Sequence, residues 1–139
     1  MVIKKDIIKF HHYGVATNSF IQPIKFHKNL GYKCTDTTRD NKQLVDLVFC
    51  VSEFMPSVEL VKPFDERSPI NGYINKNQSI IYHACYETSL QKDNIEEIFE
   101  GMNYINVVEP VPAILFNNRL VAFYYVKDLG LIEILDNQT

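Results

Sequence analysis

The chain has 139 residues, enough for one domain with a core of ordinary depth. Hydrophobic residues make up 46% of it, which excludes a disordered chain and predicts a packed globular protein. The formal net charge of −3, without any basic run, argues against a nucleic-acid partner. No apolar run reaches the length of about 18 residues that a membrane helix needs, and residues 1–6 lack a signal-peptide core. We therefore expect a cytoplasmic protein with no membrane contact.

The three cysteines, Cys34, Cys50 and Cys85, are odd in number and widely spaced. This pattern favours free thiols in a reducing compartment. The sequence has no Cys-x-x-Cys pair, so a zinc site built from thiolates is not expected. Cys85 is predicted to be a small core residue.

The first half of the chain predicts a strand, a helix and three further strands. Asn18 or Ser19 can cap the helix, and Gly31 can end it. Farther along, Ser68-Pro69 is typical of the start of a short helix, followed by a polar loop over 75–79. The predicted elements are a strand over 10–17, a helix over 20–30, strands over 32–38, 44–51 and 57–61, and a turn at 39–42.

The second half predicts the same order of elements, so the chain reads as one domain over 1–139 made of two βαβββ modules, about 8–63 and 79–136. Here Pro110 and Pro112 indicate a loop between strands. The predicted elements are a strand over 80–88, a helix around 95–102, a strand over 104–108, a loop over 110–112, a turn at 117–118, and strands over 120–126 and 130–135.

An internal repeat relates these modules. Setting His83 on His12 gives an offset of 71 residues (83 − 12), and setting Glu133 on Glu59 gives 74 (133 − 59). The difference places three net extra residues in the second module, which we expect around 113–118. His11 falls on Tyr82 in this alignment, so the repeat favours His12 as the functional histidine of the first strand.

Four polar residues, His12, Glu59, His83 and Glu133, therefore occupy matching places among apolar neighbours on the first and last strand of each module. A buried carboxylate either becomes neutral or finds a cation. Two imidazoles and two carboxylates form a reasonable site for a divalent metal such as Ni, Co, Zn or Mn. The alternative is that the histidines are satisfied core residues and the glutamates face solvent. His27, on the helix, is expected to be a packing residue.

With these motifs assembled, the chain resembles the vicinal oxygen chelate superfamily, which includes glyoxalase I, methylmalonyl-CoA epimerase, extradiol dioxygenases and bleomycin-resistance proteins. The resemblance covers about residues 8–136 and is closest to the glyoxalase I and epimerase group. The segments that carry it are His12-Tyr13-Gly14-Val15-Ala16, Val58-Glu59-Leu60-Val61-Lys62-Pro63, Tyr82-His83-Ala84-Cys85-Tyr86-Glu87 and Gly130-Leu131-Ile132-Glu133-Ile134.

This resemblance implies an α+β fold in which the two modules form curved mixed sheets around a central cavity, commonly as a homodimer. It implies one divalent metal held by His12, Glu59, His83 and Glu133, a set similar to that of bacterial glyoxalase I. The expected reaction moves a proton alpha to a carbonyl, in a thioester or hemithioacetal substrate. Glu133 would be the general base, with Glu59 in the mirror role.

Two features leave alternatives open. The epimerase has a second catalytic Glu in the turn that is 39–42 here, and either Asp40 or Asn41 could stand in its place. A non-catalytic ligand-binding protein of the bleomycin-resistance type is the main rival function, and an extradiol-type dioxygenase ranks last. Candidate cations for an anionic substrate are Lys62, Arg67, Lys76, Arg119 and Lys127.

Overall fold

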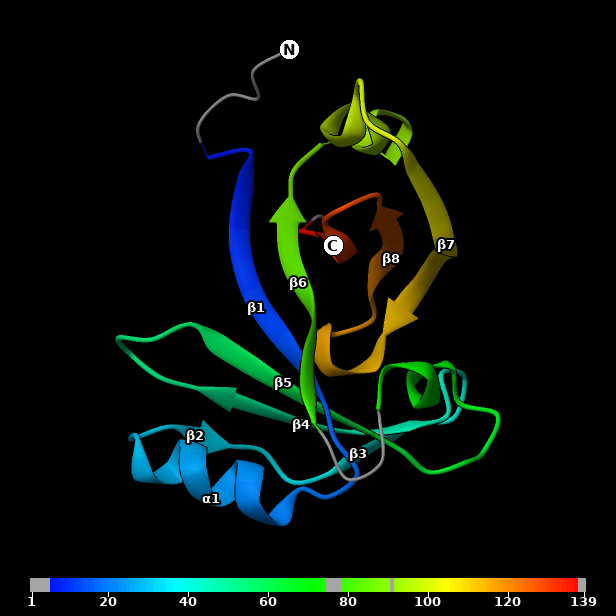
Figure 1. Cartoon of the computed structure of the whole chain (residues 1–139). Coiled ribbons are helices and arrows are strands. Elements are labelled where there is room, and N and C mark those ends of the chain that lie inside the picture. The colour runs from blue at the N-terminus through cyan, green and yellow to red at the C-terminus, as the bar shows by residue number, and fades with distance from the viewer. Residues whose placement is uncertain (1–5, 75–78, 91, 138–139) are drawn as a thin grey trace. The chain divides into compact units, whose positions relative to one another are not determined.

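A computed structural model describes residues 6–74, 79–90 and 92–137, so most of the predicted loop over 75–79 lies outside the described residues. The order of elements confirms the α+β class with two βαβββ modules and mixed sheets. These elements are β1 (Ile8–Ala16), α1 (Ile21–Asn29), β2 (Lys33–Cys34), β3 (Thr38–Asp40), β4 (Val45–Val51), β5 (Ser57–Pro63), the 3₁₀ helix η1 (Pro69–Tyr73), β6 (Ile80–Thr88), the 3₁₀ helix η2 (Lys92–Phe99), β7 (Tyr104–Ala113), the 3₁₀ helix η3 (Ile114–Phe116), β8 (Arg119–Val126) and β9 (Gly130–Asp136) (Figure 1).

The chain forms two compact units whose boundaries fall inside strands β1 and β6. The first unit is His12–Tyr82, and the second unit is Met1–His11 together with His83–Thr139. The start of β1 therefore packs with the second module. The Ser89 amide donates a hydrogen bond to the Ile7 carbonyl (3.0 Å), and the rings of Phe10 and Tyr86 meet edge to face.

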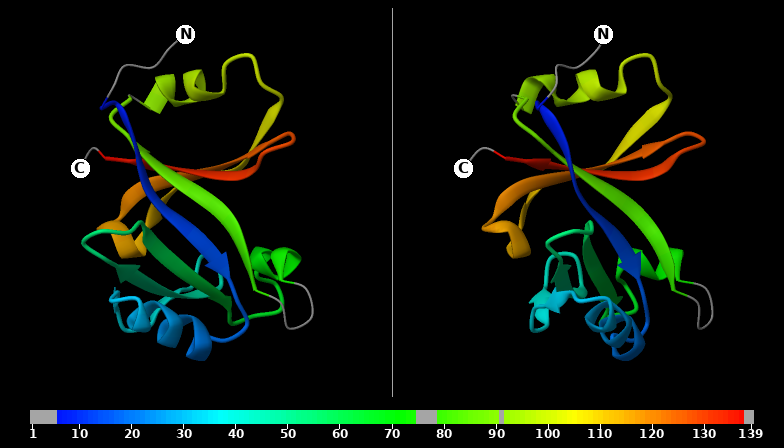
Figure 2. Two further views of the ribbon diagram at one scale, coloured as in Figure 1. Left: turned by 60° about the vertical axis from the view of Figure 1, so that its left-hand side comes forward. Right: turned by 90° about the vertical axis from the view of Figure 1, so that its left-hand side faces the viewer.

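In the first unit the strand order is β2-β4-β5-β1, and β3 also pairs with β4. Strands β1 and β5 are parallel, whereas β4 is antiparallel to β2, β3 and β5. Helix α1 lies against one side of this sheet (Figure 2). The core between them is apolar and is formed by Phe20, Tyr32, Val48, Cys50, Val58 and Leu60.

Helix α1 begins and ends close to the predicted residues. The Ser19 hydroxyl accepts a hydrogen bond from the Ile21 amide (3.3 Å), and Gly31, at φ +97°, follows the last turn. His27 is a packing residue, as expected, because its ring donates through Nδ1 to the Pro23 carbonyl (2.7 Å) and lies edge to face against Tyr32.

In the second unit the strand order is β6-β9-β8-β7, with β6 and β9 parallel and the other pairs antiparallel. The helix predicted around 95–102 is instead the 3₁₀ helix η2, and Gly101, at φ +78°, turns the chain away soon after it. The core under η2 is formed by Ile95, Phe99, Ala122, Tyr124, Val126 and Ile134.

The prediction of a loop over 110–112 is wrong. Strand β7 continues through Pro110 and Pro112 to Ala113, with register shifts against β8. Because β7 ends the strand order of its sheet, these prolines need not donate to a further strand, and the irregular register accommodates them. The extra residues expected around 113–118 coincide with η3 and with two left-handed residues, Asn117 and Asn118.

The expectation of free thiols is also wrong for two cysteines. Cys34 on β2 and Cys50 on β4 are directly opposite each other and form a disulfide. Neither the spacing of the cysteines nor their number indicates this pairing, because it depends on the register of two strands. Cys85 lies outside the disulfide and is fully buried, as predicted for a core residue.

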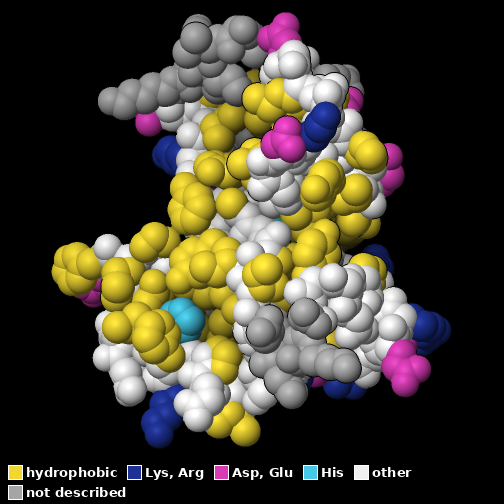
Figure 3. All heavy atoms as spheres, viewed as in Figure 1, with side chains coloured by type: hydrophobic (Ala, Val, Ile, Leu, Met, Phe, Trp, Pro, Cys, Tyr) yellow, Lys and Arg dark blue, Asp and Glu magenta, His cyan; other side chains and the backbone are white. Residues whose placement is uncertain are grey.

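Apolar side chains also reach the surface of the first unit. They gather over the turn between β4 and β5, at the left of Figure 3, where Phe54 is 92% exposed. None of the helices within 6–74, 79–90 and 92–137 combines the length and apolar character required to cross a membrane.

Candidate functional site

The first unit brings together His12 of β1 and Glu59 of β5. In the parallel β1–β5 pair Glu59 is opposite Gly14, and residues two apart on a strand share a face, so the His12 and Glu59 side chains emerge on the same side. His12 is fully buried and Glu59 is 6% exposed. The distance from His12 Nε2 to Glu59 Oε1 is 3.7 Å.

A phenylalanine on the neighbouring strand supports this pair. Phe49 of β4 is opposite Glu59 in the antiparallel β4–β5 register. Its ring meets the His12 imidazole edge to face, with 5.6 Å between centroids. An apolar ring against the imidazole limits how it can turn, so the ring and the carboxylate together define the histidine's orientation.

The second unit repeats this arrangement with different residues. Glu133 of β9 is opposite Cys85 in the parallel β6–β9 register, two residues beyond His83. His83 Nε2 lies 3.2 Å from Glu133 Oε1, and the two residues are 3% and 4% exposed. Phe123 of β8 is opposite Glu133 and meets the His83 ring edge to face, with 5.5 Å between centroids.

The duplication therefore extends to the local geometry of each histidine. In both units the carboxylate is two register positions beyond the histidine, and a phenylalanine on the next strand past the carboxylate meets the histidine ring. Each unit contributes one imidazole nitrogen and one carboxylate oxygen from buried side chains. Such donors suit borderline divalent ions, because imidazole binds Zn, Ni and Co, and carboxylate also suits Mn.

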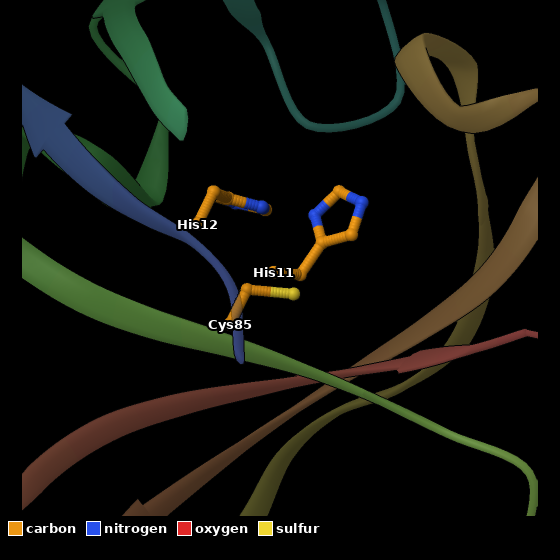
Figure 4. A group of neighbouring side chains, drawn as sticks. All are labelled: His11, His12 and Cys85. Atoms are coloured by element: carbon orange, nitrogen blue, oxygen red, sulfur yellow. The ribbon is translucent and has the colours of Figure 1, made fainter. Parts of the chain in front are cut away.

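His11, the rival of His12 on β1, has different surroundings. It belongs to the second unit, where its ring meets Phe116 edge to face at 4.9 Å. A ring nitrogen of His11 lies within 4.8 Å of Cys85 Sγ, and Figure 4 shows both side chains. The contact with Glu59 is made by His12, in agreement with the alignment of the repeats.

Asp40, one of the two candidates for a second catalytic acid, is used by the turn after β3. Its Oδ1 accepts hydrogen bonds from the amides of Lys42 (2.9 Å) and Gln43 (3.1 Å), and its Oδ2 accepts one from Gln43 Nε2 (3.2 Å). The residue is only 6% exposed. Its carboxylate thus closes the turn, and Asn41, the other candidate, faces solvent.

Several of the candidate cations are already engaged. Arg119 donates to Glu87 (2.8 Å) and to the Asp136 carbonyl (2.9 Å), and Arg67 pairs with Asp65. Lys62 lies over the Phe20 ring, and Lys127 is exposed, whereas Lys76 lies outside the described residues. Sequence reasoning overlooked Arg39, which forms two hydrogen bonds with Asp46 and lies over the Phe64 ring.

Comparisons with known proteins agree with this architecture. The family model described as the Glyoxalase/Bleomycin resistance protein/Dioxygenase superfamily matches residues 11–123. The mitochondrial methylmalonyl-CoA epimerase of Dictyostelium discoideum is 27% identical over 137 residues, which cover 94% of this chain and 80% of that protein.

Two solved structures share the fold. A hypothetical protein from Bacillus halodurans C-125 aligns with a TM-score of 0.78 and 27% identity, over 95% of this chain and 96% of its own. A Streptomyces coelicolor methylmalonyl-CoA epimerase in complex with 2-nitronate-propionyl-CoA aligns with a TM-score of 0.75 and 18% identity, over 94% of this chain and 98% of its own.

Proposed function

The chain belongs to the Glyoxalase/Bleomycin resistance protein/Dioxygenase superfamily, and on this basis we propose that it is a metal-dependent isomerase of the methylmalonyl-CoA epimerase type. The substrate class is an acyl-CoA thioester whose alpha carbon carries an acidic proton. The duplicated arrangement of histidine, glutamate and phenylalanine carries the proposal. The Dictyostelium relative and the acyl-CoA complex of the Streptomyces structure support the choice of substrate.

We further propose that His12, Glu59, His83 and Glu133 hold one divalent ion together. Each buried pair supplies two ligands, whereas protein sites for such ions usually need three or four. Neither pair is therefore sufficient alone, and the repeat makes the two pairs chemically equivalent. When bound, the ion (Ni, Co, Zn or Mn) supplies Lewis-acid stabilisation of the negative charge that develops on the carbonyl oxygen.

The proton transfer is assigned to the two glutamates. Glu133 takes the alpha proton of the thioester as general base on one face, and Glu59, in the mirror role, delivers a proton on the opposite face, so that the alpha carbon is inverted. The support for this assignment is that both carboxylates are buried beside an imidazole, at 3.2 and 3.7 Å. Asp40, whose oxygens already accept three hydrogen bonds in its turn, has no part in this proposal.

A second candidate is isomerisation of a hemithioacetal, as in glyoxalase I. The observation that favours it is the identity of Glu59, because a His/Glu/His/Glu set resembles that enzyme, whereas the epimerase typically has Gln at this place. Both reactions need the same base chemistry, so they differ in the substrate that is bound. Ligand sequestration without chemistry is the remaining rival, and the homodimer and the cytoplasmic location stay predictions.

The test is exchange of the substrate's alpha proton with D₂O, followed by NMR, with protein that has been stripped by a chelator and reloaded with each metal. Methylmalonyl-CoA and the methylglyoxal–glutathione hemithioacetal are supplied in turn. We expect exchange with methylmalonyl-CoA that depends on metal, and a loss of about 10²–10⁴-fold or more in Glu133→Gln, because a general base contributes at least this much.

Glu97→Gln is the matched control, since Glu97 is an exposed glutamate of the same unit. Turnover of the hemithioacetal alone would select the second candidate. Near-normal exchange in Glu133→Gln would refute the assignment of the base. Tight binding of either compound without exchange in any metal-loaded protein would favour the sequestering function.

A further inference from the structure

The disulfide between Cys34 and Cys50 ties the short strand β2 to β4. The amide of Thr35 donates to the Phe49 carbonyl (2.9 Å), so the next residues along, Cys34 and Cys50, form a pair without backbone hydrogen bonds. In antiparallel sheets these pairs bring opposing side chains closest together. The sequence separation of 16 residues closes a loop that contains β3 and most of β4.

The two cysteines differ in exposure. Cys50 is fully buried in the core of the first unit, whereas Cys34 is partly exposed on a strand of only two residues. Strand β2 stands at the end of the strand order, so its other edge is not paired with a strand within the described part of the first unit. Of the two cysteines, Cys34 is therefore the one that we expect a small thiol to attack, although it also packs against the core.

The strand that the disulfide holds also supports the candidate site. Thr35 binds both backbone groups of Phe49, since its amide donates to the Phe49 carbonyl and its hydroxyl accepts from the Phe49 amide (3.0 Å). Phe49 is the residue whose ring lies edge to face against His12. A change in the position of β2 would therefore affect His12 through Thr35 and Phe49.

We propose that Cys34–Cys50 is a reversible redox site that controls the docking of β2 and, through it, the packing of Phe49 on His12. The reductant class is a small thiol. One thiolate attacks Cys34 Sγ, forming a mixed disulfide and releasing Cys50, which takes up a proton. A second thiol then attacks the mixed disulfide, releases Cys34 as a thiol and leaves as an oxidised small-molecule disulfide, so two electrons pass to the protein.

If His12 is a metal ligand, reduction of the disulfide also changes the affinity for the metal. This consequence rests on the proposed function, whereas the redox site itself does not. The second unit offers an internal comparison. His83 has the same contact with Phe123, and the carbonyl of Phe123 is held by the side-chain amide of Asn106 (3.1 Å) without any disulfide. A redox effect that travels through β2 should therefore reach His12 and spare His83.

The experiment uses the metal-free full chain, oxidised with glutathione disulfide or reduced with dithiothreitol and then desalted. Alkylation after denaturation should modify one thiol in the oxidised form and all three in the reduced form. A bond that closes a loop of this length should raise Tm by about 6–12 °C. In ¹H–¹³C spectra the ring signals of His12 should shift between the two forms while those of His83 stay in place.

Cys34→Ser should show the His12 signals and the Tm of the reduced form under both treatments, and Cys85→Ser should keep the redox response. Three reactive thiols after oxidation would overturn the proposal, and so would an unchanged His12 signal. Equal shifts of His12 and His83 would also overturn it, because they would indicate a general change in the protein. These measurements are made without metal, so each result can be interpreted even if the protein proves to bind no metal.

Discussion

Replacing His83 by leucine tests what the buried His83–Glu133 pair contributes. In metal-free protein the change would leave the Glu133 carboxylate, 4% exposed, without the imidazole that lies 3.2 Å away. Removing one member of a buried histidine–carboxylate pair costs up to about 3–5 kcal/mol, because the remaining carboxylate stays desolvated and loses this interaction. Domains of this size are stable by about 5–15 kcal/mol, so the variant should still fold but with a much lower free energy of unfolding.

The double variant, in which both His83 and Glu133 become leucine, should recover most of this loss. Replacing a buried pair by apolar residues is commonly neutral or stabilising. Urea unfolding followed by circular dichroism, with a chelator present, gives the four free energies of the cycle. The exposed Asp65–Arg67 pair is the control, with a coupling of about 1 kcal/mol or less, because the Arg67 side chain is 78% exposed.

We expect a large loss of unfolding free energy in each single variant, His83→Leu and Glu133→Leu, and a small loss in the double variant. This pattern would show that the pair adds little net stability and is better explained by binding than by folding. A double variant that loses as much as the two single variants together would refute this reasoning. The pair would then be a structural element of the fold.

Two further predictions concern carboxylates in the first unit. Hydrogen bonds from Arg39 hold the pKa of the Asp46 carboxyl below its ordinary value of 3.8. The ionised Asp46 carboxylate stabilises the folded protein fully at pH values above 3.8. This stabilisation is lost as the pH falls through the lower pKa that Asp46 has in the folded protein. Asp46→Asn should therefore lower the free energy of unfolding by about 1 kcal/mol near neutral pH, and the difference should vanish in acid, as urea titrations at several pH values would reveal. Asp40→Ala should lower the free energy of unfolding by about 1–3 kcal/mol, since it leaves the turn amides unsatisfied. The rate of alpha-proton exchange per folded molecule should stay within about twofold of the unmodified protein. A loss of exchange comparable to that of Glu133→Gln would make Asp40 a catalytic acid.

The internal repeat was the most informative feature of the sequence. The offsets of 71 and 74 residues selected both histidines and both glutamates, and the strand registers confirm the correspondence: Glu59 is opposite Gly14, and Glu133 is opposite Cys85. Apolar periodicity also located most strands, because successive side chains of a strand alternate between the two faces of the sheet. The repeat also relates Phe49 and Phe123, by 74 residues, but only the structure shows that their rings contact the histidines.

Other features depend on contacts between distant segments. The disulfide depends on the register between β2 and β4, and β7 passes through Pro110 because no further strand follows it in the order of its sheet. The side chain of Asp40 could serve chemistry or a turn, and only the positions of the Lys42 and Gln43 amides decided between them.

The sequence by itself determined the module order, the repeat and the chemical identity of the four candidate ligands, since these follow from local periodicity and residue type. Only the tertiary structure decided which histidine contacts which glutamate, that Cys34 bonds to Cys50, and that the start of β1 packs with the second module. The reason is physical. Periodicity fixes the face on which a side chain lies, whereas its partner is set by strand register and packing across the chain.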